Sequence, residues 1–346
     1  MKVLVLTQKV DQNDPGLGFF HEWIRALASQ LTLLTVICLE GGEFNLPANV
    51  EVRSLGKESG RSRVKYLFNF YRFIWQQQHR YDVVFVHMNP EYIILAGWWW
   101  WLVGKRVFLW YNHRSGGWIA RLAVCFSRRV FYTADFSFAS SFKKGKQMSA
   151  GIDTERYQPN QAITRVPQSI LYLGRISPVK NTLIFIAALE QLSQQGLNFS
   201  AKIYGDPPER DEWYYQQVLA GSRLLEESKK LSWYHSVSPL DTVTVYNQNE
   251  IFVNLTQTGS FDKTILEAMA CGNLVVVSNK SFAKILPAVF MFEEKDSNSL
   301  TDRLRFVSLL TPDQKFFYRQ PFRDYVLTYH SLKVLISQLL QSFSDE

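Results

Sequence analysis

The chain lacks the residue groupings that hold metal ions or cross-link small folds. Its 346 residues include three cysteines, Cys38, Cys125 and Cys271, whose spacing fits neither a disulfide framework nor a zinc site. We interpret them as reduced core residues of a cytosolic protein. The six histidines are dispersed, and no Asp-x-Asp pair is present to hold a divalent cation. We therefore expect no metal and no other cofactor.

Long apolar runs are also scarce. Residues 1–10 lack the apolar core of a signal peptide and fit a first buried strand. The run 92–106 contains four consecutive tryptophans but is far short of the ~20 residues that a spanning helix requires. A buried helix is the simplest interpretation. Successive helix residues point about 100° apart, however, so some of the four indoles must be exposed or meet a partner.

Positive charge is concentrated in the first half of the chain. Residues 1–165 contain 21 Lys and Arg against 12 Asp and Glu, whereas the remainder contains 17 against 19, which together give the net charge of +7. This asymmetry indicates an anionic surface or substrate for the first half. The cations follow no recognisable nucleic-acid-binding pattern, so we expect no nucleic-acid partner.

One basic segment, residues 61–80, also carries many aromatic side chains. Helices of this composition are typical of proteins that lie on anionic membranes. A packed domain helix with a solvated basic face explains the segment equally well. We predict a cytoplasmic protein that associates peripherally with the inner face of a membrane.

Apolar strand-like runs alternate with helical stretches along the whole chain, as in open parallel α/β sheets. A polar segment, 151–168, separates two groups of such runs and is interpreted as an interdomain connection. The expected strands are 2–7, 31–39, 81–87, 105–111 and 128–133 in the first group, and 170–174, 199–205, 229–235, 250–255, 273–278 and 288–292 in the second.

Two cations follow the first strand of the second group. The strand ends at Gly174, Arg175 and Lys180 flank a turn that contains proline, and a helix begins near Asn181. A guanidinium, an ammonium and the free N–H groups of a helix end together suit a diphosphate. Either cation alone would be explained as a solvated loop residue, but the pair favours a binding site.

The segment 259–278, GSFDKTILEAMACGNLVVVS, combines a polar loop, a short helix and an apolar strand. Its acid Glu267 stands at the carboxyl edge of the expected sheet, where α/β folds bind ligands. The alternative is an ordinary amphipathic turn that buries Leu266 and Met269 and leaves Glu267 in solvent.

Two features of the first half are weaker signals. Gly16 and Gly18, in the loop after the first strand, would let the backbone approach a bound phosphate, although a lone G-x-G also fits a plain turn. His113 follows a strand end and is a candidate for acid–base chemistry, with His87 as its competitor. A hydrogen-bonded turn residue is an equally good interpretation of His113.

These segments together resemble the large family of retaining glycosyltransferases, family 4 or group 1, which includes bacterial lipopolysaccharide and capsule enzymes. The resemblance lies in GRISPVKN, FDKTILEAMACGNLVVVS and GIDTERY, whose order and spacing match along nearly the whole chain. It implies a GT-B fold, with two Rossmann-like α/β domains whose parallel sheets face a central cleft. It further implies a nucleoside-diphosphate-sugar donor, a glycan or lipid-linked acceptor, retention of configuration and no metal requirement.

The resemblance also implies domain bounds: an acceptor-side domain over 1–160, a nucleotide-sugar-binding domain over 168–317, and a helical tail over 318–346. In proteins of this fold the last helix crosses back to the first domain, and we consider the same course for this tail.

The resemblance assigns roles to particular residues. Arg175 and Lys180 would stabilise the departing diphosphate, Glu267 would accept hydrogen bonds from the ribose, and His113 would contact the donor sugar. The other donor-binding positions that it implies are Gly16, Gly18, Phe261, Asp262, Lys263 and Thr264.

One departure from the family pattern leaves alternatives open. Gly259 stands where the family usually has a first Glu, and Asp262 is close enough in sequence to replace its contact with the sugar. The change also fits an altered donor or a weakened enzyme. We therefore keep two other hypotheses: a non-catalytic, membrane-associated partner subunit with a degenerate donor site, and a nucleotide-sugar epimerase of the same fold.

Overall fold

The computed structural model describes residues 1–60, 62–259 and 261–345, and the chain forms two compact units. The first unit comprises Met1–Gly151 together with Leu332–Glu346, and the second comprises Ile152–Ser331. This division assigns 152–160 and 318–331 to the second unit, whereas the sequence-based bounds assign them elsewhere. Each unit is described here by itself.

The first unit is built on a seven-stranded parallel sheet with the order β3-β2-β1-β4-β5-β6-β7. The central strands are continuous apolar runs because helices cover both faces of the sheet. The strands are β1 (Lys2–Val10), β2 (Leu33–Gly41), β3 (Val50–Ser54), β4 (Val83–His87), β5 (Arg106–Trp110), β6 (Arg129–Tyr132) and β7 (Gly145–Gln147).

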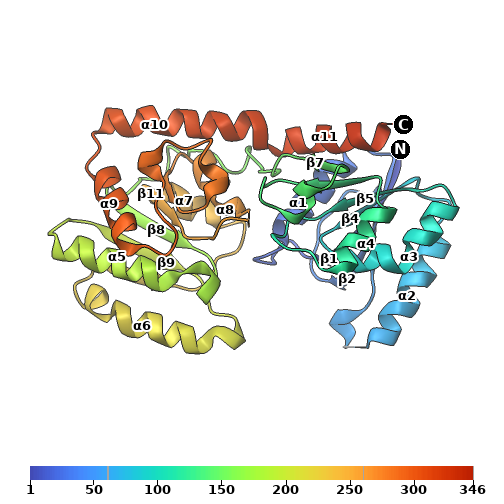
Figure 1. Ribbon diagram of the computed structural model, residues 1–346, viewed down its shortest axis with the longest axis horizontal. Helices are drawn as coiled ribbons and strands as arrows, with labels where there is room; N and C mark the ends of the chain where they lie inside the picture. The colour runs from blue at the N-terminus through green and yellow to red at the C-terminus, as the bar shows by residue number, and fades with distance from the viewer. Residues whose placement is uncertain (61, 260, 346) are drawn as a thin grey trace. The chain divides into compact units, whose positions relative to one another are not determined.

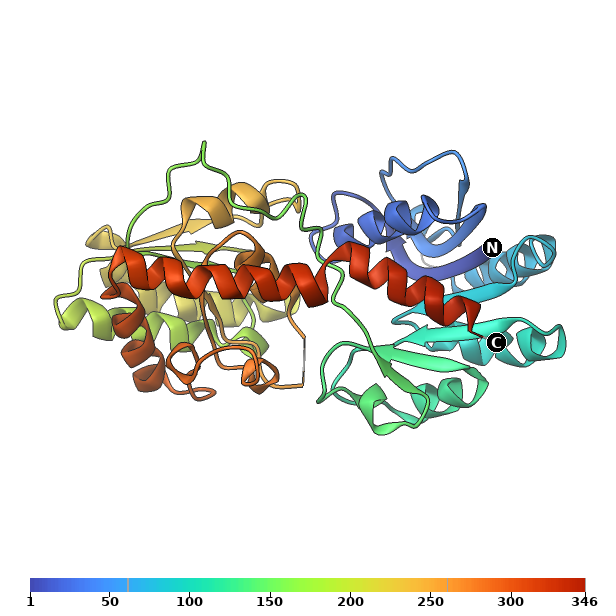
Figure 2. The same cartoon turned by 90° about the horizontal axis from the view of Figure 1, so that it is seen from above.

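Helices on the two faces of this sheet come from different parts of the chain. Helix α1 (Gly18–Ala28) and the C-terminal helix α11 (Leu332–Ser344) pack together on one face. Figure 2 shows the red α11 beside the blue elements of this unit. Helices α2 (Arg63–Gln76), α3 (Glu91–Leu102) and α4 (Trp118–Phe126) bury their inner sides in the core of the opposite face (Figure 1).

The second unit has a five-stranded parallel sheet with the order β10-β9-β8-β11-β12. Its strands are β8 (Ser169–Leu173), β9 (Ser200–Tyr204), β10 (Leu231–Tyr234), β11 (Ile251–Asn254) and β12 (Leu274–Val277). Its helices are α5 (Thr182–Gln194), α6 (Glu212–Glu227), α7 (Thr242–Gln248), α8 (Lys263–Ala270), α9 (Ser297–Ser308) and α10 (Pro312–Tyr325), followed by a π-helical turn at Val326–His330. The strand order reverses between β8 and β11, so the loops after these two strands diverge at a switch point.

Short 3₁₀ turns complete the two units. They lie at Lys57–Ser59, Phe138–Ser141, Pro178–Lys180, Glu209–Asp211, Lys280–Phe282 and Ala288–Phe290.

The secondary structure expected from the sequence is wrong in three places. Strands β3 and β7 were not expected, and the predicted strand 288–292 is a 3₁₀ turn, with Met291 forming only an isolated bridge to Val277. Phe290 packs instead against Tyr318 and Phe322 of α10, at ring distances of 4.8 and 5.1 Å.

Two further expectations concern single residues. Cys38 and Cys271 are buried as expected, but Cys125 is exposed on α4 and is not a core residue. Trp100 is fully buried and donates its Nε1–H to Tyr81 Oη at 3.1 Å, while Trp98 and Trp101 are exposed. The four indoles therefore divide between core and surface as the helical spacing requires. No helix in the described ranges is long and apolar enough to cross a membrane.

Candidate functional site

The candidate site lies at the carboxyl edge of the second sheet, where the loops that follow β8 and β11 diverge. Strands β8 and β11 are hydrogen-bonded neighbours, so residues just beyond their ends come close together. The loop after β8 carries Arg175 and Lys180, and the loop after β11 leads to Asp262 and helix α8. Ligands of open α/β sheets bind at such a position.

The loop after β8 is held against the end of β9. The Gly174 N–H donates to the Tyr204 carbonyl at 3.0 Å, and the Ile176 N–H donates to the Asp206 carbonyl at 3.1 Å. Gly205 has φ +156°, and a Cβ there would lie 2.0 Å from the Gly174 oxygen. Only glycine at 205 permits this approach. Arg175 is therefore presented, with an exposed side chain, from a backbone fixed on both sides.

Lys180 is the last residue of a 3₁₀ turn, and Asn181 joins this turn to helix α5. Asn181 has φ +52°, a left-handed conformation that asparagine adopts more readily than most residues. Its Nδ2 donates to the Leu255 carbonyl at 3.1 Å. This bond ties the Lys180 turn to the end of β11.

The Lys180 ammonium is bound by the loop after β11. Its Nζ donates to Thr256 Oγ1 at 3.0 Å and forms an ion pair with Asp262 Oδ2. An ammonium has three N–H donors. The side chains of Thr256 and Asp262 account for two of them.

Asp262 is the hydrogen-bond centre of the site. It caps helix α8 by accepting from the Thr264 N–H at 3.2 Å, and it also accepts from Thr264 Oγ1 at 2.7 Å. Asn254 Nδ2 and Thr256 Oγ1 donate to its other oxygen at 3.0 and 2.9 Å. Burial opposes ionisation of Asp262, but the Lys180 charge and these hydrogen bonds prevail and hold its pKa well below the usual range.

Glu267 lies on α8, one turn beyond the cap, and is only partly exposed. The Tyr246 hydroxyl donates to Glu267 Oε2 at 3.1 Å. Burial raises the pKa of Glu267 above its ordinary value, and it lowers the pKa of Lys263, whose attraction to Glu267 opposes both shifts. Leu266 and Met269 are in the core as expected. Glu267 is therefore not an ordinary solvated residue on a helix surface.

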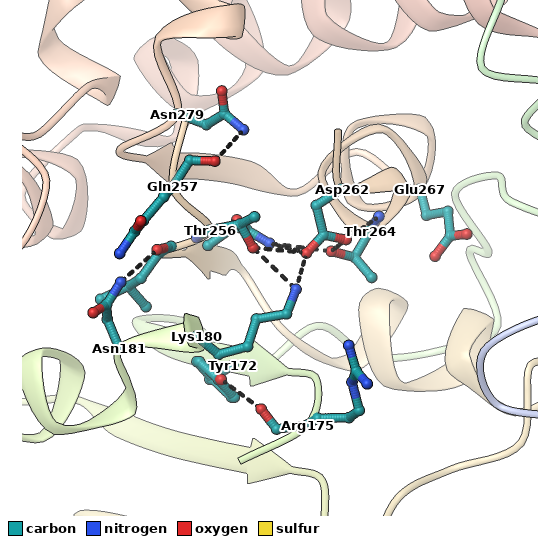
Figure 3. Close-up of polar contacts among 12 residues, drawn as sticks. Tyr172, Arg175, Lys180, Asn181, Thr256, Gln257, Asp262, Thr264, Glu267 and Asn279 are labelled. Carbon is teal, nitrogen blue, oxygen red and sulfur yellow. Dashed lines mark hydrogen bonds and ion pairs between the residues drawn. The ribbon is translucent and has the colours of Figure 1, made fainter. Parts of the chain in front are cut away.

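Figure 3 shows how these side chains lie. The Lys180 side chain extends towards Asp262 and Thr256, and the Arg175 guanidinium projects from the β8 loop on the same side as the Lys180 ammonium. Glu267 lies beyond Thr264 along α8. Two cations and a half-buried acid thus come from three separate points of the chain to one edge of the sheet.

The remaining residues of the predicted segment have structural contacts. Phe261 packs against Phe282 and His330, with ring centroids 5.5 and 6.0 Å apart. Thr258 donates from its N–H and its hydroxyl to Glu294 Oε1, at 2.7 and 2.5 Å, which fixes the loop just before Gly259. Ser260, which also belongs to the segment, lies outside the described residues.

Three predicted residues belong to the first unit. The N–H groups of Gly16 and Gly18 donate within their own loop, to Asp14 Oδ1 at 2.9 Å and to the Asp14 carbonyl at 2.8 Å. His113 is exposed after β5, its carbonyl accepts from the Phe138 N–H, and partial burial of its ring lowers its pKa.

His87, the competing candidate, is a core residue. It is 2% exposed, its Nδ1 lies 3.4 Å from Thr7 Oγ1, and its ring stacks on Phe20 at 4.0 Å. These contacts give His87 a packing role within the first unit.

Sequence reasoning missed three residues that shape the site: Tyr246, Asn254 and Thr256. Asn254 was detectable, because it is a polar residue that ends an apolar strand at the carboxyl edge of the sheet. Tyr246 and Thr256 carry no comparable signal. The described residues contain no group of three or more His, Cys, Asp or Glu that could hold a metal ion.

Comparisons with known proteins agree with this geometry. Residues 167–308, which contain the site, match the family described as Glycosyl transferases group 1. A comparison with curated proteins gave no match. This segment is less than half of the chain, and over it the protein is similar to that family.

Solved structures of the whole GT-B fold match the entire chain at low identity. HepE (Alr3699) from Anabaena, in complex with UDP and glucose, is 16% identical, with all of both chains covered and a TM-score of 0.79. A glycosyltransferase from Rickettsia africae is 16% identical over 99% of this chain and 98% of its own, with a TM-score of 0.75. Sucrose-phosphate synthase from Thermosynechococcus elongatus is 14% identical over 99% and 98%, with a TM-score of 0.74. The chain therefore has the GT-B fold.

Proposed function

We propose that the protein is a retaining, metal-independent glycosyltransferase of the hexosyltransferase type. It moves a sugar from a nucleoside-diphosphate donor to a hydroxyl group of a glycan or lipid-linked acceptor. The observation that carries the proposal is the convergence of Arg175, Lys180 and Glu267 at the switch point of the second sheet, within the segment that matches the family. Anabaena HepE, which has the same fold, was also crystallised in complex with UDP-glucose.

The cations supply the electrostatics of the reaction. As the bond between the sugar and the diphosphate breaks, negative charge grows on the leaving diphosphate. Arg175 and the third N–H of Lys180 stabilise that charge, which is the work that a metal ion performs in other enzymes. Asp262 accepts from four groups of the protein besides Lys180, so we assign it the task of positioning Lys180 rather than holding the sugar.

The remaining residues orient the donor. Glu267 accepts hydrogen bonds from the ribose, and the backbone around Phe261, Lys263 and Thr264 approaches the sugar. His113 contacts the donor sugar, and the loop with Gly16 and Gly18 binds a phosphate or the acceptor. The acceptor oxygen forms its bond to the anomeric carbon on the face from which the diphosphate leaves. Because the new bond forms on the face that the leaving group vacates, the configuration is retained. The acceptor proton passes to a diphosphate oxygen, and the nucleoside diphosphate leaves.

The proposal also covers the location of the protein and its macromolecular partners. The acceptor-side unit carries the basic excess of the chain, which suits an anionic membrane surface and a peripheral position at the inner, cytoplasmic face. We propose no nucleic-acid partner.

A thermal-shift screen with nucleoside diphosphates tests this function. We expect one nucleoside diphosphate to raise the unfolding temperature without added metal, and Lys180→Ala to abolish the shift. Transfer from the matching nucleotide sugar, followed by mass analysis of the glycan product, would then identify the acceptor. If no nucleoside diphosphate stabilises the protein, the hypothesis of a non-catalytic partner subunit is favoured instead.

A further inference from the structure

The outer faces of helices α2 and α3 expose aromatic side chains that the core of the first unit does not use. Helix α2 buries Phe70 and Ile74 beneath it, and α3 buries Trp100. The Tyr71 hydroxyl donates to the Leu95 carbonyl at 3.0 Å, so the two helices lie side by side (Figure 1). We call their outer surface the α2–α3 face; its exposed apolar residues are Val64, Phe68, Trp75, Trp98, Trp101 and Leu102.

The exposure of these side chains is large. Phe68 is 66% exposed, and Trp101 is 73% exposed. A groove of about 500 Å³ runs along α2 and is lined mainly by Leu67, Phe68, Tyr71 and Trp75. A soluble monomer rarely leaves this many neighbouring aromatic residues in water without a binding role. We therefore expect a binding partner to cover the α2–α3 face when the protein is functioning.

The charge around the face limits what covers it. Arg63, Lys65 and Arg72 are exposed on α2, and within the described ranges none of the three forms an ion pair. Apart from Glu91, the first residue of α3, the sequence has no Asp or Glu at 59–81 or at 91–134, the two stretches that contain α2, α3 and α4, and these stretches hold eleven Lys and Arg. The face is apolar, and the charged residues around it are mainly cationic.

We propose that the α2–α3 face docks on the surface of a membrane that contains anionic phospholipids. Aromatic rings insert at the boundary between headgroups and acyl chains, and arginine and lysine contact the phosphates. A second copy of the chain is a poor occupant, because pairing two such faces would bring like charges together. The inference deepens the proposed membrane location, and it does not depend on donor binding at the second unit.

Sedimentation with vesicles tests the proposal. The full chain is mixed with vesicles of phosphatidylcholine alone or of phosphatidylcholine with phosphatidylglycerol, at low and at high salt. We expect binding to the anionic vesicles only, with loss of binding as salt screens the charges. Tryptophan fluorescence should be quenched by brominated lipid, because Trp75, Trp98 and Trp101 would lie at the bilayer surface.

Two double variants separate the apolar and charged contributions. Phe68→Ser with Trp101→Ser removes exposed rings, and Lys65→Glu with Arg72→Glu reverses exposed charges, so neither pair disturbs the core. Each is expected to weaken vesicle binding at least about tenfold, since one cation near a charged bilayer changes binding about fivefold and the charge variant alters two cations. The matched controls in the second unit are Phe316→Ser with Phe317→Ser, and Arg210→Glu with Arg223→Glu, which alter equally exposed residues.

The outcomes distinguish this inference from the proposed function. Vesicle binding that is absent, or that both α2–α3 variants retain, overturns the docking proposal even if the protein transfers sugar. A dimer seen by light scattering that only the α2–α3 variants lose would assign the face to a second copy and also overturn it. Lys180→Ala should keep vesicle binding, and the α2–α3 variants should keep the nucleoside-diphosphate thermal shift.

Discussion

The Lys180 ammonium is ion-paired with the Asp262 carboxylate, and the same carboxylate caps helix α8. The two residues come from loops that follow neighbouring strands, β8 and β11. The pair therefore links the placement of a cation to the start of the helix that carries Glu267. A change at either partner is expected to affect both the site and the local fold.

Lys180→Ala should lower turnover with the nucleotide sugar by about 100-fold or more, the usual cost of removing a group that stabilises transition-state charge. It also leaves Asp262 without its cation, so the free energy of unfolding should fall by about 2 kcal/mol. This is less than for a fully buried pair, because the Lys180 side chain is 20% exposed. Steady-state kinetics and urea denaturation measure the two effects. Lys180→Met with Asp262→Asn is the control: we expect it to recover stability but not turnover.

Asp262→Asn tests whether Asp262 acts through Lys180. Asparagine is as good a helix N-cap as aspartate, so α8 should remain capped while the ion pair is lost. We expect kcat to fall, and the thermal stability at neutral pH to fall as well, because Lys180 loses the carboxylate with which it pairs. Because the pKa of Asp262 is depressed in the folded state, its stabilising effect is present above the unfolded pKa of ~3.9 and is lost as pH falls further. A variant that keeps full kcat would remove Asp262 from the positioning of Lys180.

The Glu267 carboxyl group should affect the pH dependence of stability in the direction opposite to that of Asp262, and Glu267→Gln should remove this effect. The raised pKa of Glu267 means that the folded state binds this proton more tightly than the unfolded state. The free energy of unfolding of the natural protein should therefore decrease as pH rises from about 4.3 towards the raised value. Urea denaturation across this range should show a flatter profile for Glu267→Gln. Parallel profiles for the two proteins would contradict the burial effect.

The two histidines of the first unit should respond differently to substitution. His113→Ala should reduce turnover more than it reduces donor binding, while the unfolding temperature stays nearly unchanged because the side chain is exposed. His87→Ala removes a ring that stacks on Phe20 in the core, so it should cost about 2 kcal/mol of stability. Calorimetric donor binding and kinetics separate these effects. Unchanged turnover in His113→Ala would exclude this residue from the mechanism.

Long apolar strands were predictable from the sequence, and short polar strands were not. β3 reads VEVRS and β7 reads GKQ, so neither has the apolar run that marks a buried strand. Both lie at the edges of the sheet, where one side of the backbone has no neighbouring strand. The run AVFMF has the composition of a strand, but Phe290 is used to pack against α10, and Pro287 precedes the turn. Tertiary contacts therefore determine the conformation of this segment.

In the candidate site, too, features of the local sequence were predictable and long-range contacts were not. Arg175 and Lys180 could be selected because they follow a strand end, and Glu267 because it lies on a short helix between a polar loop and an apolar strand. The bonds of Asp262 to Lys180 and Asn254, and of Tyr246 to Glu267, join residues whose meeting depends on the strand order. No local pattern contains that information. The sequence therefore predicted where charge would gather, but not which groups hold it in place.

The position of the Arg175 side chain depends on Gly205, a residue far from it in the sequence. Gly205 has no functional side chain. Because it has no Cβ, however, the Gly174 carbonyl can pack against it, and the ends of the two strands can lie in contact. Any larger residue there would push the β8 loop outward and carry the guanidinium with it. A position thirty residues away in sequence, just after a different strand, thus acts as a spacer that sets the reach of this cation, and engineering of donor preference would have to leave it untouched.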